Sequence, residues 1–312
     1  MRVVYFGSGS FSVPSLRAVL ESRHEVVGIY TQPARPAGRG GHWRPTAVCE
    51  AGRAAGRGVV ECPNINAPEV VAEIRALNAD VICVVDFGQF IKQPVLDAAG
   101  LGAFNLHGSL LPLLRGAAPI QWALIRGFET TGVTSFRIVQ AMDAGPIYLQ
   151  QAADIGPDET AEQLKGRLAR LGAQAVCRTL DMLADGSARL VEQDHSQATP
   201  APRLQKSDGH IDWSADALAI HNLIRGTWPW PGGQAVLRRQ FGPDVPVTIA
   251  RARMLPGPAR GCAGELDAEM AVSAGAGRLG IEEIHPAGKR LMKWVDFMNG
   301  YRLRPGDRLL GP

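Results

Sequence analysis

The 312-residue sequence is poor in cysteine and has no long hydrophobic run. Its five cysteines are scattered at Cys49, Cys62, Cys83, Cys177 and Cys262. They form no Cys-x-x-Cys pair, so neither a disulfide framework nor a zinc ribbon is expected. No apolar stretch approaches the roughly 18 residues that a membrane span needs, and no signal peptide precedes the strand-like segment at Arg2. We therefore expect a cytoplasmic protein with reduced thiols and no membrane partner.

Several nucleotide and metal motifs are also missing. Gly7-Ser8-Gly9 follows the first strand-like segment, but Ser12 stands where a dinucleotide fingerprint has its third glycine. The sequence has no GxxxxGK[ST] loop, no HExxH motif and no Cys/His spacing that suits zinc. We expect no metal site and no permanently bound cofactor.

The N-terminal part of the chain alternates predicted strands with predicted helices. We place strands at 3–6, 25–30, 81–85, 103–106, 132–138 and 147–152, and helices at 12–21, 66–77, 119–126 and 160–185. Asn66 with Glu69, and Thr160 with Gln163, resemble capping boxes, and Gly186 is expected to end the last helix. This order predicts an α/β fold with a doubly wound, mostly parallel, Rossmann-like sheet. Ligands of such sheets bind at the carboxyl ends of the strands.

The C-terminal part differs in pattern and in charge. After a polar linker at 193–207, we expect Ser214 to cap a helix that runs to Arg225, with Gly226 just beyond its end. Short β-like runs at 234–237, 245–254 and 280–284 then predict a small all-β barrel of the OB type. The predicted domains are 1–192 and 208–312. Residues 203–312 carry 15 Lys/Arg against 11 Asp/Glu. This excess fits an RNA-binding surface or ordinary surface variation.

An amide, an imidazole and a carboxylate stand out in two short segments. Asn105 and His107 are two residues apart, so on a strand they point to the same face, and Asp143 lies beside a Gly-Pro turn. A donor for an oxyanion, a proton acceptor and a group that orients it are what direct acyl-type transfer requires. A lone buried, hydrogen-bonded histidine at a strand end would be the alternative interpretation.

The surrounding residues, FNLHGSLLPLLRGAAPIQW and later MDAGPI, decide between these readings. The chain resembles the formyltetrahydrofolate-dependent formyltransferases, whose signature is Asn-x-His, then SLLPxxRGxxP, then a distal Asp before Gly. The resemblance implies 10-formyltetrahydrofolate as co-substrate and Asn105, His107 and Asp143 as the catalytic residues. It also implies a folate pocket shaped by Ser109, Leu110, Leu111 and Pro112 and by Phe87, Gly88, Gln89 and Phe90.

A basic loop, TQPARPAGRG at 31–40, bears on the acceptor. It resembles the loop of the family branch that formylates charged initiator tRNA rather than nucleotide sugars. The resemblance implies that Arg35 and Arg39 contact the acceptor stem, with Arg44 and a stacking Trp43 in place of the family's usual lysines. Asp86 and Leu113 also depart from the family, which has an apolar residue and Arg there.

The sequence thus predicts direct transfer of a formyl group to the α-amino group of methionine on initiator tRNA, for translation initiation. We expect a monomer that binds initiator tRNA and formyl-folate but not DNA. An N-formyltransferase of amino-sugar nucleotides is the nearest alternative. A non-catalytic RNA- or folate-binding protein and a formyltetrahydrofolate hydrolase are the others.

Overall fold

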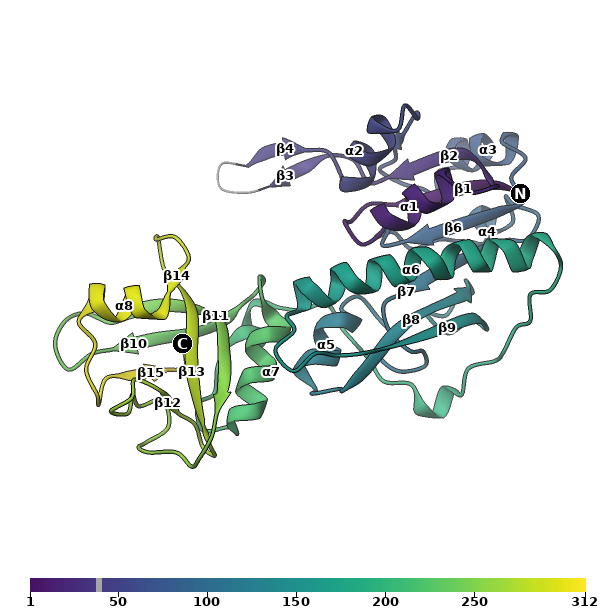
Figure 1. The fold of residues 1–312 in the computed structure, drawn as a ribbon. Helices are drawn as coiled ribbons and strands as arrows, with labels where there is room; N and C mark the ends of the chain where they lie inside the picture. Colours follow the sequence, from purple (N-terminus) through teal and green to yellow (C-terminus); the bar gives the residue numbers. More distant parts are fainter. Residues whose placement is uncertain (38–40) are drawn as a thin grey trace. The chain divides into compact units, whose positions relative to one another are not determined.

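The computed structural model describes residues 1–37 and 41–312, which form two compact units (Figure 1). The first unit comprises Met1–Pro119, Thr130–Asp154 and Lys165–Ala201. The second comprises Ile120–Glu129, Ile155–Leu164 and Pro202–Pro312. None of the helices that the described residues form is long and apolar enough to cross a membrane.

A seven-stranded sheet forms the centre of the first unit, in the order β5-β2-β1-β6-β7-β8-β9. The first five strands of this order are parallel, and β8 is antiparallel to both of its neighbours, β7 and β9. The strands are β1 (Arg2–Gly7), β2 (Glu25–Thr31), β5 (Val60–Glu61), β6 (Val81–Val85), β7 (Ala103–His107), β8 (Thr130–Arg137) and β9 (Ile147–Asp154). This topology confirms the predicted mostly parallel, Rossmann-like sheet.

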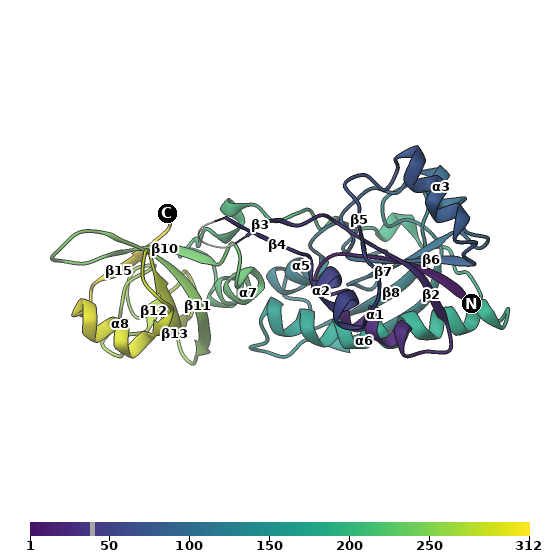
Figure 2. The same ribbon diagram turned by 90° about the horizontal axis from the view of Figure 1, so that it is seen from above.

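Helices cover both faces of this sheet, as the continuous burial of strands such as β1 and β6 requires (Figure 2). The helices are α1 (Val13–Leu20), α2 (Ala47–Ala54), α3 (Pro68–Ala76), α4 (Gln93–Leu96) and α6 (Ala161–Ala184). Val4, Phe6 and Val84 pack in one cluster with residues of α3 and α4. On the opposite face, Thr179 of α6 donates a hydrogen bond to Ser135 Oγ of β8 at 2.8 Å. The parallel strands therefore end at one edge, where β6 and β7 deliver Asp86 and His107.

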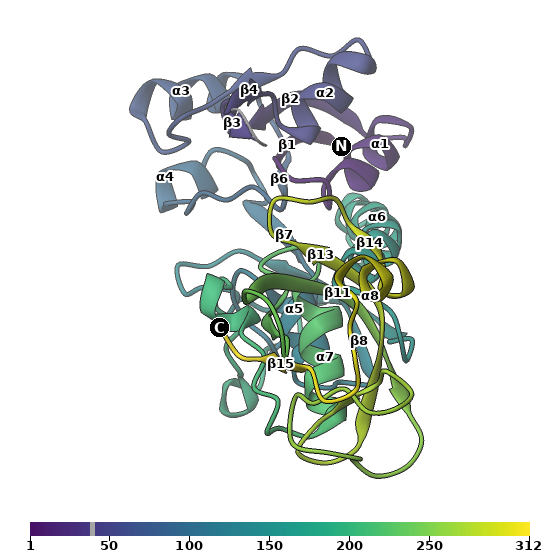
Figure 3. The same ribbon diagram turned by 90° about the vertical axis from the view of Figure 1, so that its left-hand side faces the viewer.

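The second unit is built on an antiparallel sheet in the order β12-β13-β11-β10-β15, with β14 paired to β13 (Figure 1). Figure 3 shows β11, β13 and β15 with helices α7 and α8 from another side. Bridges from Glu265 to Arg308 and from Leu266 to Val272 join its two ends, which makes the sheet barrel-like and confirms the predicted barrel. Its elements are α5 (Pro119–Ile125), α7 (Ala217–Thr227), β10 (Gly233–Arg238), β11 (Val245–Leu255), β12 (Val272–Ser273), β13 (Arg278–Pro286), β14 (Met292–Lys293), α8 (Trp294–Tyr301) and β15 (Arg308–Leu310).

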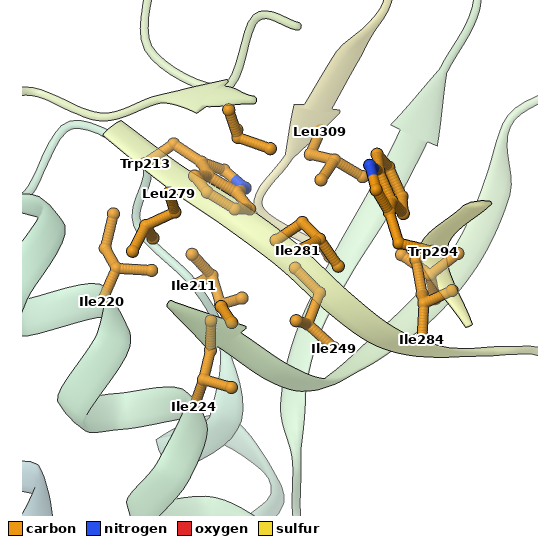
Figure 4. Packing of buried hydrophobic residues seen from close by; sticks show 14 of the residues in the cluster. Ile211, Trp213, Ile220, Ile224, Ile249, Leu279, Ile281, Ile284, Trp294 and Leu309 are labelled. Carbon is orange, nitrogen blue, oxygen red and sulfur yellow. The ribbon is translucent and has the colours of Figure 1, made fainter. Parts of the chain in front are cut away.

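The core of this second unit joins α7 and α8 to the strands (Figure 4). Ile220 and Ile224 of α7 pack with Ile249 and Ile281 of the central strands. Each such buried side chain contributes about 1.5–3 kcal/mol relative to an exposed one. The sequence analysis did not predict α8, whose Trp294 and Phe297 rings stack at 5.5 Å.

Two predicted helix starts are wrong. The helix expected from Ser214 begins at Ala217, because Asp216 accepts the backbone N–H of Leu218, whereas Ser214 bonds Asp212 in a local turn. Gly226 lies inside α7, where a Cβ would come within 3.0 Å of the Ile125 backbone nitrogen, so it serves close packing. Asn66 caps nothing in α3, since its side chain bonds Phe90 O and Lys92 N instead.

The basic loop at 31–40 contains part of a hairpin rather than only irregular chain (Figure 1). Strands β3 (Arg35–Ala37) and β4 (His42–Arg44) pair antiparallel, with Arg35 opposite Arg44 and Pro36 opposite Trp43. Arg39 lies outside the described residues. The hairpin leaves Arg35, Arg44 and Trp43 exposed, the last to 72%.

Residues 193–201, the first part of the predicted linker, belong to the first unit. Arg115 N donates to Thr199 O at 2.8 Å, and Ala201 N donates to Arg115 O at 2.6 Å. This segment therefore packs on the chain that follows the Asn-x-His motif.

Candidate active site

Asn105 and His107 lie on one face at the end of β7, as their spacing predicts. Hydrogen-bonded strands flank Asn105 on both sides, with Val84 of β6 and Phe136 of β8 as its partners. The Asn105 side chain is half-buried. Within 1–37 and 41–312, no group forms a hydrogen bond with its amide. An amide held by rigid strands but not engaged in the fold is available as a donor to a bound substrate.

The His107 ring is buried and held by a backbone carbonyl. Its Nε2 lies 2.9 Å from Leu114 O. Because a carbonyl oxygen only accepts, Nε2 carries the hydrogen, and the lone pair of the neutral ring is at Nδ1. Nδ1 lies 3.8 Å from Asp143 Oδ2. The Nδ1 lone pair of the ring therefore faces the Asp143 carboxylate.

Asp143 is fixed by the chain that follows the motif. Gly116 N donates to its Oδ2 at 2.8 Å, and the Asp143 side chain is only 14% exposed. Its φ is +50°, in the left-handed region that non-glycine residues rarely adopt. Such backbone persists only where the surroundings enforce it, and it is common at functional sites. The structure thus brings the three predicted catalytic residues to one edge of the sheet.

The Gly108–Pro112 turn is held from within. Ser109 is buried, and its hydroxyl donates to Leu113 O at 2.6 Å. Thr134 Oγ1 donates to Ser109 O at 2.7 Å. Leu111 is also buried, whereas Leu110 and Pro112 are partly exposed. Of the four residues predicted to contact folate here, Leu110 and Pro112 are the accessible ones.

The Phe87–Phe90 loop likewise has two residues fixed within the fold and two that are exposed. Phe87 is buried and packs on Phe6 at 5.1 Å between ring centroids. Gln89 is anchored, because its amide donates to Cys62 O and accepts from Ile65 N, both at 2.8 Å. Gly88 is exposed, and Phe90 is 55% exposed. An exposed aromatic ring beside a glycine is suited to stack on a flat ligand such as a pterin.

Asp86, one of the two departures from the family pattern, has a distinct electrostatic environment. The Asp86 side chain is still 42% exposed, but desolvation by the surrounding chain raises the pKa of its carboxyl, and Lys165, whose Nζ is 4.0 Å from Oδ2, opposes that shift. Asp86 O accepts the backbone N–H groups of Ser8 and Gly9. A Cβ at Gly9 would meet the Asp86 carboxylate, so a larger residue there would force the Asp86 side chain to turn away. Leu113, the other departure, is half-buried.

The base of the β3–β4 hairpin is tied to the sheet. Thr31 and Thr46 hydroxyls lie 2.6 Å apart, and Ala34 N donates to Glu61 Oε2 at 3.0 Å. This N–H and the nearby Arg53 hold the pKa of Glu61 below its usual range. Arg35 Nη2 donates to Gln32 Oε1 at 2.8 Å. The hairpin therefore presents its arginines from a fixed base.

Sequence reasoning missed three groups that hold the site. These are the Leu114 carbonyl, the Gly116 N–H and the Gln193 side chain, whose amide donates to Asp143 O at 2.9 Å. Of these three residues, only Gly116 could have been singled out from the sequence, because a glycine can mark a close backbone approach. A Cβ at this position would lie 2.5 Å from Ala201 O. In the part of the chain that the structure describes, no group of three or more His, Cys, Asp or Glu residues is arranged to hold a metal ion.

Comparison with known proteins identifies the family. The family described as formyl transferase matches residues 1–180, and its C-terminal domain matches residues 203–302. A methionyl-tRNA formyltransferase of Solibacter usitatus is 42% identical over 312 residues, which cover 99% of this chain and 98% of that protein.

Solved structures share the fold at low identity. The sugar 3N-formyl transferase WlaRD, determined with dTDP and 5-N-formyl-THF, has a TM-score of 0.64 at 15% identity, covering 93% of this chain and 99% of that one. HypX from Aquifex aeolicus, in complex with tetrahydrofolic acid, has a TM-score of 0.61 at 14% identity. The match covers 96% of this chain but only 47% of HypX. On the family matches and the full-length relative, the chain belongs to the formyltransferase family.

Proposed function

We propose that this chain transfers the formyl group of 10-formyltetrahydrofolate to the α-amino group of methionyl initiator tRNA. One observation carries the proposal: Asn105, His107 and Asp143 gather at the end of β7 in a chain that aligns over its whole length with methionyl-tRNA formyltransferases. The proposed domains are a catalytic domain at 1–192 and a tRNA-binding domain at 208–312, joined by a linker at 193–207 whose first part, 193–201, packs within the first unit. We place the enzyme in the cytoplasm, where charged tRNA is used, and propose that it acts as a monomer.

The proposed chemistry is a direct attack of the amine on the formyl carbon. An α-amino group has a pKa near ~8, so a useful fraction is neutral at pH 7. The C–N bond to methionine forms, and the tetrahedral oxyanion accepts a hydrogen bond from the Asn105 amide. His107 takes a proton from the attacking nitrogen at Nδ1 and returns one to the departing folate nitrogen. Asp143 stabilises the imidazolium between these two steps.

Substrate contacts follow from exposure. Gly88, Phe90, Leu110 and Pro112 are the predicted folate residues with accessible surface, and the buried Phe87, Ser109 and Leu111 with the anchored Gln89 set their positions. We propose that Arg35 and Arg44 contact tRNA phosphates from the hairpin, where Trp43 can stack on a base, and that Arg39, which lies outside the described residues, also contacts the tRNA.

The proposal is tested by following the product. The chain is incubated with 10-formyltetrahydrofolate and methionyl initiator tRNA, the aminoacyl ester is hydrolysed, and N-formylmethionine is quantified. We expect N-formylmethionine to accumulate in proportion to enzyme. Release of free formate without N-formylmethionine would instead identify a hydrolase.

Replacing Arg35 and Arg44 with alanine is expected to weaken tRNA use without changing the chemistry. Each phosphate contact contributes about 0.7–0.9 to the slope of log affinity against log salt for nucleic acids, so losing two should flatten that slope by about 1.5. KM for charged tRNA should rise, while kcat and KM for formyl-folate stay constant. Steady-state kinetics at several salt concentrations check this, and adding Arg39→Ala should deepen the effect.

The exposed Arg57, which follows α2 and is not part of the hairpin strands, provides the matched control. Arg57→Ala should leave the salt slope as it is in the wild type. A hairpin variant that formylates charged tRNA normally at physiological salt would show that the hairpin does not bind RNA.

Chelation is expected to leave turnover unchanged, because the donor and the proton carrier are both side chains in this mechanism. The measurement is the rate of formyl transfer after exhaustive dialysis against EDTA. Loss of activity that zinc restores would contradict a mechanism of this kind.

A further inference from the structure

Gln193 holds a buried position in an otherwise exposed segment. Residues 189–192 and 194–197 are exposed, whereas Gln193 is only 5% exposed. The chain is pinned before and after it. Val191 exchanges two backbone hydrogen bonds with Ile147, and Thr199 O accepts from Arg115 N. The Gln193 side chain therefore has a fixed direction.

Both ends of the Gln193 amide are engaged. Its Nε2 donates to Asp143 O at 2.9 Å and to Gly145 O at 2.7 Å. Its Oε1 accepts from Arg115 Nη2 at 2.6 Å and from Nε at 3.2 Å. An amide is the side-chain group that can donate two hydrogen bonds and accept others at the same time.

These bonds complete a ring around the catalytic pair. Arg115 lies between Leu114, whose carbonyl holds His107, and Gly116, whose N–H holds the Asp143 carboxylate. Gln193 links Arg115 back to the Asp143 backbone. Asp143 has the left-handed φ of +50°, so its carboxylate faces His107 only while this backbone is constrained.

We propose that Gln193 is a positioning residue that holds the Asp143 backbone so that the carboxylate faces His107 Nδ1. This inference rests on the proposed function. It predicts an effect on the proton-transfer step and none on either substrate site, because the hydrogen bonds of the Gln193 side chain go to Arg115, Asp143 and Gly145 and to none of the proposed folate or tRNA contacts.

The test compares Gln193→Met with Gln193→Glu. Met removes both donors while keeping the volume. Glu keeps an acceptor for Arg115 but turns a carboxylate oxygen toward two carbonyl oxygens. We expect kcat for formyl transfer to fall about 10- to 100-fold in both variants, since small displacements of catalytic groups cost that much, with both KM values unchanged. The exposed Gln197→Met serves as the matched control and should behave as the wild type.

A double-variant measurement separates positioning from general stability. In an Asp143→Asn background, Gln193→Met should lower kcat by less than twofold, because the interaction it serves is already lost. Melting curves establish whether each variant is folded. If Gln193→Met does not fold, the kcat of Gln193→Glu alone tests the proposal.

Three results would overturn the proposal. The first is a Gln193→Glu variant with wild-type kcat, which would mean that Gln193 serves to hold Arg115. The second is a Gln193→Met substitution that lowers kcat as much in the Asp143→Asn background as in the wild type. The third is a Gln193 variant whose KM rises while its kcat stays constant. An inactive wild-type enzyme would instead refute the proposed function, so the two failures are distinguishable.

Discussion

Replacing His107 with alanine is expected to lower kcat for formyl transfer by about 10²–10⁴, the usual contribution of a general acid–base group. The ring is positioned by Leu114 O and faces Asp143, so alanine removes the proton carrier and leaves the Asp143 carboxylate without its partner. Rapid-quench measurement of N-formylmethionine checks the effect. The exposed His210 in the second unit is the matched control, and His210→Ala should keep wild-type kcat.

The partners of His107 have separable roles. Asn105→Asp keeps the shape but removes the donor, so it should lower kcat about 10²–10³-fold, the typical cost of a lost oxyanion donor. Asp143→Asn keeps the acceptor for Gly116 N but removes the charge that favours the imidazolium. It should therefore lower kcat more than it alters either KM. A folded His107→Ala variant with near-normal kcat would refute these assignments.

Replacing Asp267 with alanine is expected to destabilise the second unit by about 3–5 kcal/mol, the cost of breaking a buried ion pair. Asp267 and Arg278 are bonded at 2.9 Å with side chains 3% and 6% exposed. The Asp267 carboxylate also accepts the backbone N–H groups of Glu269 and Ala271. Alanine would leave these donors unpaired, and the guanidinium would keep the half-exposed Glu269 carboxylate and the Pro256 carbonyl as its partners.

Tryptophan fluorescence during urea unfolding measures this loss. The second unit contains Trp122, Trp213, Trp228, Trp230 and Trp294, whereas Trp43 alone belongs to the first. Asp244→Ala removes an exposed partner of Arg238 in the same unit and should cost below about 1 kcal/mol. Equal losses in the two variants would mean that burial of the Asp267–Arg278 pair has no special energetic importance.

The Asp267–Arg278 pair is expected to make the free energy of unfolding depend on pH. Burial alone would raise the pKa of Asp267, but the N–H groups of Ala271 and Glu269 and the Arg278 guanidinium together hold it below its usual range. A carboxylate with a depressed folded pKa stabilises the protein above its unfolded value of about 3.9, and that stability is lost as the pH falls through the folded pKa. The difference between wild type and Asp267→Ala should therefore narrow below about pH 4.

The sequence predicted those features that depend on local pattern. The buried run at Val81–Val85 and the two-residue spacing of Asn105 and His107 gave the strands, and with them the edge where the site lies. Helix α8 was missed because Lys293, at its N-cap, makes no side-chain capping bond. The start of α7 was placed too early, since Ser214 and Asp216 are both suitable caps and only the tertiary structure chooses between them.

Groups that act through the backbone or over long sequence separations could not be predicted. The position of the Leu114 carbonyl is set by the path of the backbone and not by the side chain of Leu114. Gln193 lies 50 residues from Asp143, in a segment whose polar composition indicates only a linker. The hairpin β3–β4 was read as a loop because Pro36 and the flanking glycines are typical of turns.

The central claim is the identity of the acceptor, and competition between acceptors tests it most directly. One preparation is assayed with 10-formyltetrahydrofolate and, in turn, methionyl initiator tRNA, a charged elongator tRNA and a dTDP-linked amino sugar. We expect kcat/KM for the initiator tRNA to exceed each of the others by at least about tenfold, with the advantage over the sugar nucleotide reduced when Arg35 and Arg44 are replaced. A kcat/KM for the amino-sugar nucleotide that equals or exceeds that for charged initiator tRNA would contradict the proposed function.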